Sequence, residues 1–583
     1  MNYKEIYQEW LENDSLGKDI KSDLEAIKGD ESEIQDRFYK TLEFGTAGLR
    51  GKLGAGTNRM NTYMVGKAAQ ALANTIIDHG PEAIARGIAV SYDVRYQSKE
   101  FAELTCSIMA ANGIKSYIYK GIRPTPMCSY AIRALGCVSG VMVTASHNPQ
   151  AYNGYKAYWK EGSQILDDIA DQIANHMDAI TDYQQIKQIP FEEALASGSA
   201  SYIDESIEEA YKKEVLGLTI NDTNIDKSVR VVYTPLNGVG NLPVREVLRC
   251  RGFENVYVVP EQEMPDPDFT TVGYPNPEVP KAFAYSESIG KSVDADILLA
   301  TDPDCDRVAL EVKDSKGEYI FLNGNKIGAL LSYYIFSQRC ALGNLPHHPV
   351  LVKSIVTGDL SKVIADKYNI ETVETLTGFK NICGKANEYD ISKDKTYLFG
   401  YEESIGFCYG TFVRDKDAVS ASMMVVEMTA YYKERGQTLL DVLQTIYDEF
   451  GYYNERQFSL ELEGAEGQER ISRIMEDFRQ DPILQVGEMT LENSIDFKDG
   501  YKDFPKQNCL KYYFNEGSWY ALRPSGTEPK IKCYLYTIGC TEADSLSKLN
   551  AIESACRAKM NSTNVKKAMR NSLPFLLIKI DTK

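Results

Sequence analysis

The chain has 583 residues, 43% of them hydrophobic and 25% charged, which is the composition of an ordinary globular protein. This length is too great for one hydrophobic core and predicts about three to five domains. The formal net charge of −19 at pH 7 argues against a nucleic-acid partner, because binding a phosphate backbone requires a basic surface.

The beginning of the chain lacks the basic start and apolar core of a signal peptide, and no apolar run approaches the length of a membrane span. We therefore expect a cytoplasmic protein without a membrane partner. The 12 cysteines include no Cys-x-x-Cys pair, and several, such as Cys106 and Cys533, lie in apolar stretches. This pattern favours reduced core thiols over zinc ligands or disulfides.

The first expected elements are helices, followed by an alternation of strands and helices. Up to about residue 40, apolar residues recur at helical spacing with acids between them, which predicts a solvated helical arm. A strand at 87–92, a helix at 99–112 and a strand at 116–119 follow. This βαβ order predicts a layered α/β domain.

The alternation begins again at the strands expected at 229–234 and 350–355, so three α/β domains of similar size are expected. They are compatible with an old triplication, although no short-period repeat is present. The stretch 418–435 predicts a helix with Asp417 as its N-cap and Gly436 as its stop.

After about residue 450 the pattern changes to short alternating strands, for example 531–536, followed by a helix. This predicts an α+β domain at the end of the chain. The expected domain ranges are 1–205, 206–320, 321–448 and 449–583.

A hydroxyl of nucleophile size, Ser146, lies in Thr-Ala-Ser-His-Asn-Pro at 144–149, directly after the apolar run 140–143. In α/β sheets the chemistry lies in loops at the ends of strands. A polar turn is the alternative for this motif alone, because Ser and Asn-Pro favour turns.

The second motif is Thr-Asp-Pro-Asp-Cys-Asp-Arg at 301–307. Carboxylates at alternate positions of an extended chain point to one side and form an oxygen cage for a hard cation such as Mg²⁺. A calcium EF-hand is excluded, because Arg307 and Lys313 stand where that loop needs glycine and glutamate. A solvated acidic turn remains the open alternative.

Two further motifs follow expected strands. The segment 400–406 offers Glu402 and Ser404, which suit sugar hydroxyls, although a Glu-Glu pair alone is usually a solvated surface. The segment 523–530 resembles an anion cradle, with the alternative of an idle turn. Its candidate groups are Arg523, Ser525, Gly526, Thr527 and the nearby Lys532.

These four motifs, in this order, resemble the phosphoserine, metal, sugar and phosphate loops of the α-D-phosphohexomutase family. The likeness runs nearly end to end, and the segments 42–51 and 414–417 also resemble its phosphoglucomutase and phosphopentomutase branch. The resemblance implies a four-domain fold, with three similar α/β mixed-sheet domains and a C-terminal α+β domain around a central cleft. It also implies an isomerase, an intramolecular phosphotransferase of carbohydrate metabolism.

The resemblance implies a role for each candidate residue. Ser146 would carry the phosphate and, with Asp302, Asp304 and Asp306, hold Mg²⁺. Glu402, Ser404 and Arg307 would bind the sugar, and the cradle of the last motif its distal phosphate. The candidates for proton and phosphoryl transfer, with their individual roles left open, are His147, Lys156, Arg50 and Lys416.

The leading hypothesis is interconversion of α-D-glucose 1-phosphate and glucose 6-phosphate through a phosphoserine, with glucose 1,6-bisphosphate as intermediate and activator. Alternatives are phosphopentomutase or phosphomannomutase activity, or a phosphotransferase that releases the sugar bisphosphate. An inactive sugar-phosphate sensor is disfavoured, because the serine and all three aspartates are present. Asn237, Cys305 and Ile405 depart from the family pattern and leave the sugar preference open. The expected partner is a small-molecule sugar phosphate, bound by a monomer or weak homodimer.

Overall fold

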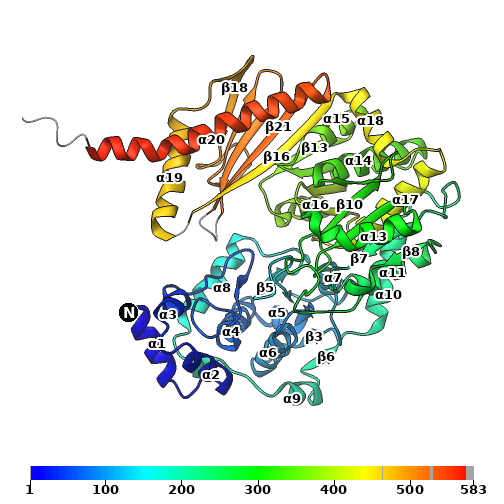
Figure 1. Cartoon of the computed structure of the whole chain (residues 1–583). Helices are drawn as coiled ribbons and strands as arrows, with labels where there is room; N and C mark the ends of the chain where they lie inside the picture. Colours follow the sequence, from blue (N-terminus) through cyan, green and yellow to red (C-terminus); the bar gives the residue numbers. More distant parts are fainter. Residues whose placement is uncertain (1, 463, 526–529, 573–583) are drawn as a thin grey trace, which may run out of the picture. The chain divides into compact units, whose positions relative to one another are not determined.

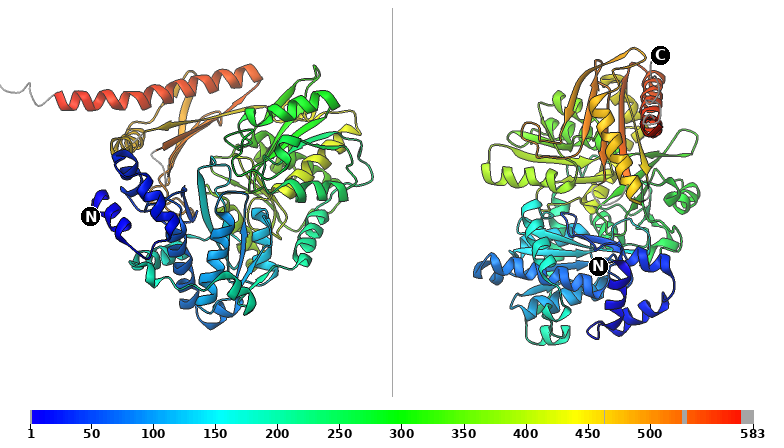
Figure 2. Two further views of the ribbon diagram at one scale, coloured as in Figure 1. Left: turned by 60° about the horizontal axis from the view of Figure 1, so that its bottom comes forward. Right: turned by 90° about the vertical axis from the view of Figure 1, so that its left-hand side faces the viewer.

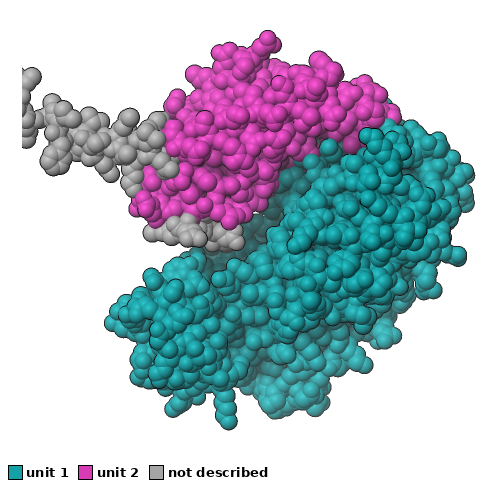
Figure 3. Space-filling view, viewed as in Figure 1, with its two compact units in different colours: residues 1–353, 365–373, 378–442 teal, residues 354–364, 374–377, 443–583 magenta. Residues whose placement is uncertain are grey.

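The structure is a computed structural model, and it describes residues 2–462, 464–525 and 530–572. Four β-sheets follow one another along the chain (Figure 1). Two compact units divide it: residues 1–353, 365–373 and 378–442 form the first, and residues 354–364, 374–377 and 443–583 the second (Figure 3). In the described part, no helix combines the length and the apolarity needed to cross a bilayer.

The chain begins with three short helices, α1 (Tyr3–Glu12), α2 (Lys18–Ala26) and α3 (Glu31–Phe38). Trp10, Leu24 and Phe38 are buried in a small core that these helices share with Ala55, and Tyr63 and Tyr183 pack against it. The prediction of helices is confirmed. The prediction of a solvated arm is wrong, because the apolar faces of the three helices pack against one another and are buried.

The first sheet has the order β1-β5-β4-β2-β3-β6, in which β2 runs parallel to β3 and β4, and β5 is antiparallel to β4 and β1. Strands β2 and β4 are buried throughout, as expected for strands covered on both faces. The strands are β1 (Leu49–Lys52), β2 (Ile88–Tyr92), β3 (Ser116–Ile118), β4 (Ser139–Val143), β5 (Tyr152–Trp159) and β6 (Ala200–Tyr202). The helices around them include α4 (Thr62–Asp78), α6 (Ser98–Ala111), α7 (Thr125–Ala134) and α8 (Asp167–Ala179).

The second sheet has the order β11-β10-β9-β7-β8, and β9 returns antiparallel as β10. Its strands are β7 (Val231–Thr234), β8 (Val256–Val258), β9 (Ile297–Thr301), β10 (Val308–Lys313) and β11 (Tyr319–Leu322). Helices α11 (Asn241–Cys250), α12 (Pro260–Glu263) and α13 (Ala284–Val293) accompany it.

The third sheet has the order β13-β12-β14-β15. Its strands are β12 (Pro349–Ser354), β13 (Glu371–Thr375), β14 (Thr396–Glu402) and β15 (Gly406–Tyr409), and α14 (Gly324–Ala341) and α16 (Phe379–Ser392) flank them. Helix α17 (Ala418–Lys433) follows, and the Asp417 carboxylate accepts the N–H groups of Val419 and Ser420. The predicted N-cap is therefore confirmed, and the helix ends shortly before Gly436.

The fourth sheet, in the second unit, is antiparallel throughout, with the order β16-β21-β20-β19-β18-β17. Helices α19 (Gly464–Gln480) and α20 (Glu542–Ser572) share its core, and α20 lies along the sheet (Figures 1 and 2). The strands are β16 (Tyr452–Glu461), β17 (Gln485–Val486), β18 (Met489–Asp496), β19 (Leu510–Phe514), β20 (Trp519–Pro524) and β21 (Lys530–Gly539). The predicted fold class, three mixed α/β domains followed by an α+β domain, is confirmed.

The three α/β sheets share one device that places the predicted motifs. In each, a strand turns back into an antiparallel neighbour, and the motif is the connecting loop: β4 to β5, β9 to β10 and β14 to β15. Each loop contains a non-glycine residue with left-handed backbone: Ser146 (φ 52°), Cys305 (φ 54°) and Ile405 (φ 53°). This conformation is uncommon for such residues, and its recurrence is a further likeness among the three α/β domains.

Candidate functional site

The serine loop connects β4 to β5 and places Ser146 against the second sheet. The Ser146 backbone N–H donates to Thr144 Oγ1 at 2.8 Å. Its Oγ donates to Asp302 Oδ2 at 2.8 Å and lies 3.2 Å from His147 Nδ1. Ser146 is buried, so the contacts of its hydroxyl with the carboxylate and the imidazole are shielded from solvent.

A buried aspartate and arginine hold this loop, and sequence reasoning missed both. Asp93 Oδ2 accepts the Thr144 hydroxyl at 2.6 Å. The Arg95 guanidinium donates to the carbonyl oxygens of Ser146 (2.6 Å), Pro149 (2.9 Å) and Tyr152 (3.0 Å). The available signal was their position directly after β2, where polar groups meet the end of the neighbouring β4.

The aspartate loop forms a tight turn, so the prediction of an extended backbone is wrong. Asp302 Oδ1 accepts the backbone N–H groups of Asp306 (3.1 Å) and Arg307 (3.0 Å), which folds the loop over its own first carboxylate. The three aspartates still converge, because one oxygen of each lies within 4.8 Å of the others.

This carboxylate group fits a hard divalent cation. Asp304 Oδ1 and Asp306 Oδ1 are buried and accept no hydrogen bond from the described residues. Burial, followed by the charges of Asp304 and Asp306, raises the pKa of Asp302 well above its ordinary value. Three buried carboxylates are therefore not all ionised without more positive charge, and oxygen-only donor sets suit Mg²⁺.

Two lysines and one arginine partly neutralise the aspartates. Lys156 Nζ lies 2.7 Å from Asp304 Oδ2, and Lys416 Nζ lies 3.1 Å from Asp306 Oδ2. Burial opposes ionisation of Asp306, but Lys416, Lys156 and Arg307 together hold its pKa below the usual range. Burial would lower the pKa of both lysines, but the aspartates beside them raise it, so both stay charged.

Neighbouring elements fix the positions of these charges. The Thr125 hydroxyl, at the start of α7, donates to Asp304 Oδ2 at 2.8 Å. Lys416 also pairs with Asp415 at 2.9 Å. A Cβ atom on Gly406 would lie 2.2 Å from Lys416 Cδ, so glycine at this position leaves room for the Lys416 side chain.

His147 and Arg50 lie at the edge of the cluster. Burial, together with the charges of Arg307 and Arg50, lowers the pKa of His147 well below its ordinary value. The ring is therefore neutral near pH 7. Arg50 lies on β1 and donates to the Asn148 side chain at 3.4 Å, so its exposed guanidinium stands beside the serine loop.

The predicted sugar-binding loop is the turn between β14 and β15. Glu402 Oε1 accepts the N–H of Gly378 at 2.7 Å, and Ser404 is half-buried. This loop is a tight turn, in which Ile405 has left-handed backbone (φ 53°) and leads the chain directly into β15. Both candidates nevertheless lie at the end of β14 in the first unit, together with the serine and aspartate loops.

The predicted phosphate cradle belongs to the second unit. Arg523 on β20 and Lys532 on β21 are direct partners across the ladder, so their side chains share one face of the sheet. The Ser525 N–H donates to the Lys530 carbonyl at 2.7 Å. Gly526 and Thr527 lie outside the described residues.

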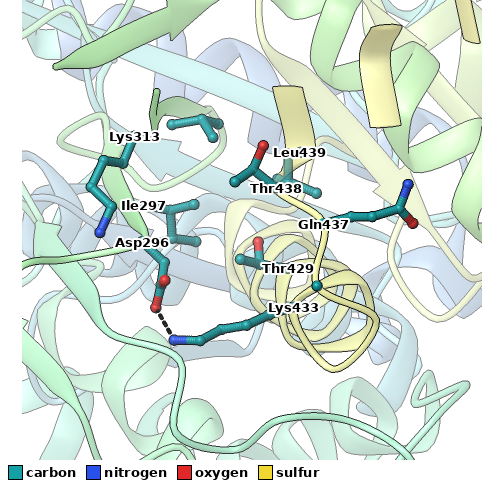
Figure 4. Close-up of a pocket in the computed structure, with 10 residues that line it drawn as sticks. Asp296, Ile297, Lys313, Thr429, Lys433, Gln437, Thr438 and Leu439 are labelled. Atoms are coloured by element: carbon teal, nitrogen blue, oxygen red, sulfur yellow. Dashed lines mark hydrogen bonds and ion pairs between the residues drawn. The ribbon is translucent and has the colours of Figure 1, made fainter. Parts of the chain in front are cut away.

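A small cavity of about 150 Å³ lies away from these loops. Asp296 lines it and precedes β9, whereas the aspartate loop follows the same strand. Lys433 donates to Asp296 Oδ2 at 2.7 Å, and Figure 4 shows the two side chains pointing toward each other. None of the predicted site residues lines this cavity.

Comparison with known proteins agrees with this arrangement. Residues 41–184, 204–317 and 323–450 match the families described as phosphoglucomutase/phosphomannomutase, alpha/beta/alpha domains I, II and III. A phosphoglucomutase of Staphylococcus epidermidis is 35% identical over 552 residues, covering 92% of this chain and 98% of the relative. One of Staphylococcus aureus is 36% identical over 564 residues, covering 93% and 97%.

Two solved structures share the fold. A putative phosphomannomutase from Thermus thermophilus has a TM-score of 0.66 at 21% identity, covering 88% of this chain and 99% of the other. The open form of pp63/parafusin from Paramecium has a TM-score of 0.66 at 18% identity, covering 90% and 96%. With its three matched domains and its near-complete overlap with curated relatives, the chain belongs to the phosphoglucomutase/phosphomannomutase family.

Proposed function

We propose that the protein is a phosphoglucomutase, which interconverts α-D-glucose 1-phosphate and glucose 6-phosphate through phosphorylated Ser146. The observation that carries this proposal is the Ser146 hydroxyl, 2.8 Å from one of three buried aspartates. Relatives named phosphoglucomutase, alike over nearly the whole chain, support glucose rather than a pentose or mannose.

Mg²⁺ is the metal we propose, held by Asp302, Asp304, Asp306 and the phosphorylated Ser146. When bound, the ion would neutralise charge on the carboxylates and the transferring phosphoryl group. The residues of the chain would provide the rest. Lys156, Lys416 and Arg307 surround the aspartates, and these fixed charges favour the added negative charge of phosphoserine.

The proposed reaction has two balanced steps. A sugar hydroxyl attacks the phosphoserine phosphorus, its O–P bond forms as the Ser146 Oγ–P bond breaks, and the proton of the sugar hydroxyl passes by way of a base to the leaving Ser146 Oγ. Glucose 1,6-bisphosphate then presents its other phosphate: Ser146 Oγ attacks this phosphorus, the Oγ–P bond forms as the sugar O–P bond breaks, and the released sugar oxygen takes up a proton. Ser146 Oγ donates to Asp302 in the structure, and His147 Nδ1 lies 3.2 Å away. For neutral His147 to accept the serine proton in this second step, the hydroxyl would turn from Asp302 toward an unprotonated Nδ1.

The remaining candidates bind the sugar phosphate. Glu402 and Ser404 would form hydrogen bonds with sugar hydroxyls, while Arg50 would lie beside the transferring phosphoryl group. The cradle of Arg523, Ser525, Gly526, Thr527 and Lys532 would hold the phosphate that is not reacting. We also propose a cytoplasmic location, which suits a small metabolite as the substrate. The proposed oligomeric state is a monomer or weak homodimer.

A coupled assay with glucose, mannose and ribose 1-phosphates, with and without glucose 1,6-bisphosphate, tests this function. We expect the highest kcat/KM with glucose 1-phosphate and stimulation by the bisphosphate. A tenfold or greater preference for another sugar, about 1.4 kcal/mol in transition-state binding, would reassign the substrate. Accumulation of free bisphosphate in place of the isomer would favour the phosphotransferase alternative.

A further inference from the structure

One irregular segment of the second domain, residues 266–278, meets the serine loop of the first. It lies between α12 and α13 and contributes no strand to its own sheet. Asp266 holds its first turn by accepting the N–H groups of Asp268 (2.9 Å) and Thr270 (3.0 Å). The segment therefore has a fixed shape, and its side chains reach across the domain boundary.

Phe269 makes the most buried of these contacts. Its side chain is fully buried, and the Arg95 guanidinium carbon lies 5.0 Å from its ring centroid, within range of a cation–π interaction. Arg95 is the residue whose guanidinium binds the carbonyls of Ser146, Pro149 and Tyr152. Phe269 has left-handed backbone (φ 47°), a strain that persists only where the surroundings require it.

Asp268 makes two further contacts, one with the neighbour of Arg95 and one with the serine loop that Arg95 binds. Its Oδ1 accepts the Tyr96 hydroxyl at 3.0 Å and also the Gln150 amide. Tyr96 follows Arg95 directly, and Gln150 lies four residues after Ser146. One carboxylate of the second domain thus joins the segment after β2, which carries Arg95, to the serine loop, whose carbonyl groups Arg95 binds.

Two further contacts of this segment, one aromatic and one charged, involve residues beside the reacting groups. The Tyr274 ring lies edge-on to the His147 ring, with centroids 6.2 Å apart. Glu278 Oε2 lies 3.7 Å from Arg307 Nη1. The segment therefore contacts His147 and Gln150 on the serine loop and Arg307 on the aspartate loop.

We propose that Asp268 and Phe269 are positioning residues for phosphoryl transfer. They hold Arg95 and Gln150 from the second domain, so that Ser146 keeps its left-handed backbone and its hydroxyl stays directed at Asp302. In-line transfer depends on this placement, and a phosphoserine that moves away from it meets water in place of a sugar hydroxyl. This inference rests on the proposed function and adds a role for residues that the motifs do not contain.

The test compares Asp268→Ala, Gln150→Ala and the double variant, with the exposed Glu261→Ala as matched control. Because small misplacements near a reacting atom cost up to about a hundredfold, we expect each single change to lower kcat about tenfold, with KM within about twofold. The double variant should be no slower than Asp268→Ala, because the two single changes remove the same Asp268–Gln150 contact. Asp268→Asn, which keeps an acceptor oxygen, should restore most of the rate.

A second readout separates positioning from stability. Enzyme labelled with ³²P at Ser146 is mixed with glucose 1-phosphate, and inorganic phosphate is counted for each mutase turnover. We expect this ratio to rise about fivefold in Asp268→Ala and Phe269→Leu, and to stay at the wild-type value in Phe269→Tyr. These changes should appear at temperatures where each variant is fully folded by circular dichroism.

Three results would overturn the inference: additive losses in the double variant, an unchanged ratio of hydrolysis to turnover, or rates that fall only with the folded fraction. Each would reduce the segment to ordinary packing. A wild-type enzyme that lacks mutase turnover would instead contradict the proposed function, so the two failures are distinguishable.

Discussion

Ser146 Oγ and Asp302 Oδ2, from loops of the first and second sheets, lie 2.8 Å apart and share a hydrogen bond. The contact brings a phosphate-sized position against three carboxylates. Two unit charges about 4 Å apart repel by about 4 kcal/mol at an effective dielectric constant of 20, so phosphoserine needs compensating cations here. Loss of the serine, of the carboxylates or of the cations beside them should therefore disturb the reaction.

Ser146→Ala should abolish mutase turnover and leave the fold intact, because a single hydroxyl contributes about 1 kcal/mol to stability but is the proposed covalent carrier. Coupled assays and thermal melting measure the two effects. Ser292→Ala, at an exposed position on α13, is the matched control and should keep full activity. Substantial turnover in Ser146→Ala would disprove the assignment.

Metal removal should inactivate the enzyme reversibly, with Mg²⁺ restoring activity. Asp304→Asn and Asp306→Asn remove a charge from the three-carboxylate group and should raise the Mg²⁺ concentration needed for half-maximal activity. At about 100 times the dissociation constant, Mg²⁺ should also stabilise the wild type by about 2.7 kcal/mol, measured by denaturant unfolding. Full activity in excess chelator, with no metal found by elemental analysis, would exclude the metal site.

Gly406→Ala should reduce kcat, because the new Cβ would displace the Lys416 side chain at 2.2 Å and with it the charge beside Asp306. Gly384→Ala is the matched control, since its Cβ meets nothing within 4 Å and the residue lies inside α16. This control should stabilise the protein by about 0.5–1 kcal/mol and keep the wild-type rate. Equal rates in both variants would show that Lys416 does not contribute to the reaction.

Stability should depend on pH through Glu311, which is buried on β10 with an Oε2 atom that accepts no hydrogen bond from the described residues. Burial, and then the charge of Glu287, raises the pKa of Glu311 to about 8. An unfolded glutamate ionises near pH ~4.3, so the unfolded chain holds fewer protons between these values. The contribution of this group to the free energy of unfolding therefore falls as pH rises from about 4.3 to about 8, by up to about 1.4 kcal/mol per pH unit.

Glu311→Gln should remove this decline and stabilise the protein at about pH 8–9, as measured by urea unfolding between about pH 5 and 9. Glu287→Gln removes a repelling charge, so it should lower the pKa of Glu311 and end the decline at a lower pH. The exposed Glu261→Gln should have no effect. Identical pH profiles for wild type and Glu311→Gln would contradict the burial of an ionisable carboxyl.

Arg523→Ala should impair both directions of the reaction alike, because we propose that the same cradle holds whichever phosphate is not reacting. Loss of a charge-assisted and bidentate contact costs about 1.5–3 kcal/mol, or about 10- to 150-fold in kcat/KM. The kcat/KM of Arg523→Lys should fall between those of the wild type and Arg523→Ala, since lysine keeps the charge and loses the planar guanidinium. A defect confined to one direction would indicate separate phosphate sites.

The sequence alone predicts those features that depend on residue type and strand position. Ser146 and the three aspartates follow buried strands, and Asp417 precedes an apolar helix, so their places follow from local pattern. The backbone of the aspartate loop does not, because Asp302 accepts the N–H groups of Asp306 and Arg307 and bends the chain.

Long-range contacts explain the rest of what sequence reasoning missed. Arg95 binds carbonyl groups of residues 146–152, which carry no signal in residue type. Phe269 contacts Arg95 and Asp268 contacts Gln150, each more than a hundred positions earlier in the chain. The three initial helices share a core that a single helical stripe cannot indicate, because burial depends on the partner helix.

Transfer of label from Ser146 tests the central claim most directly. Enzyme carrying ³²P on Ser146 is mixed with unlabelled glucose 1-phosphate and stopped within the first turnover. We expect the label to leave Ser146 at the rate of the steady-state reaction and to appear in glucose 1,6-bisphosphate and glucose 6-phosphate. Label that stays on the protein while glucose 6-phosphate forms, or that passes only to inorganic phosphate, would contradict a phosphoserine mutase.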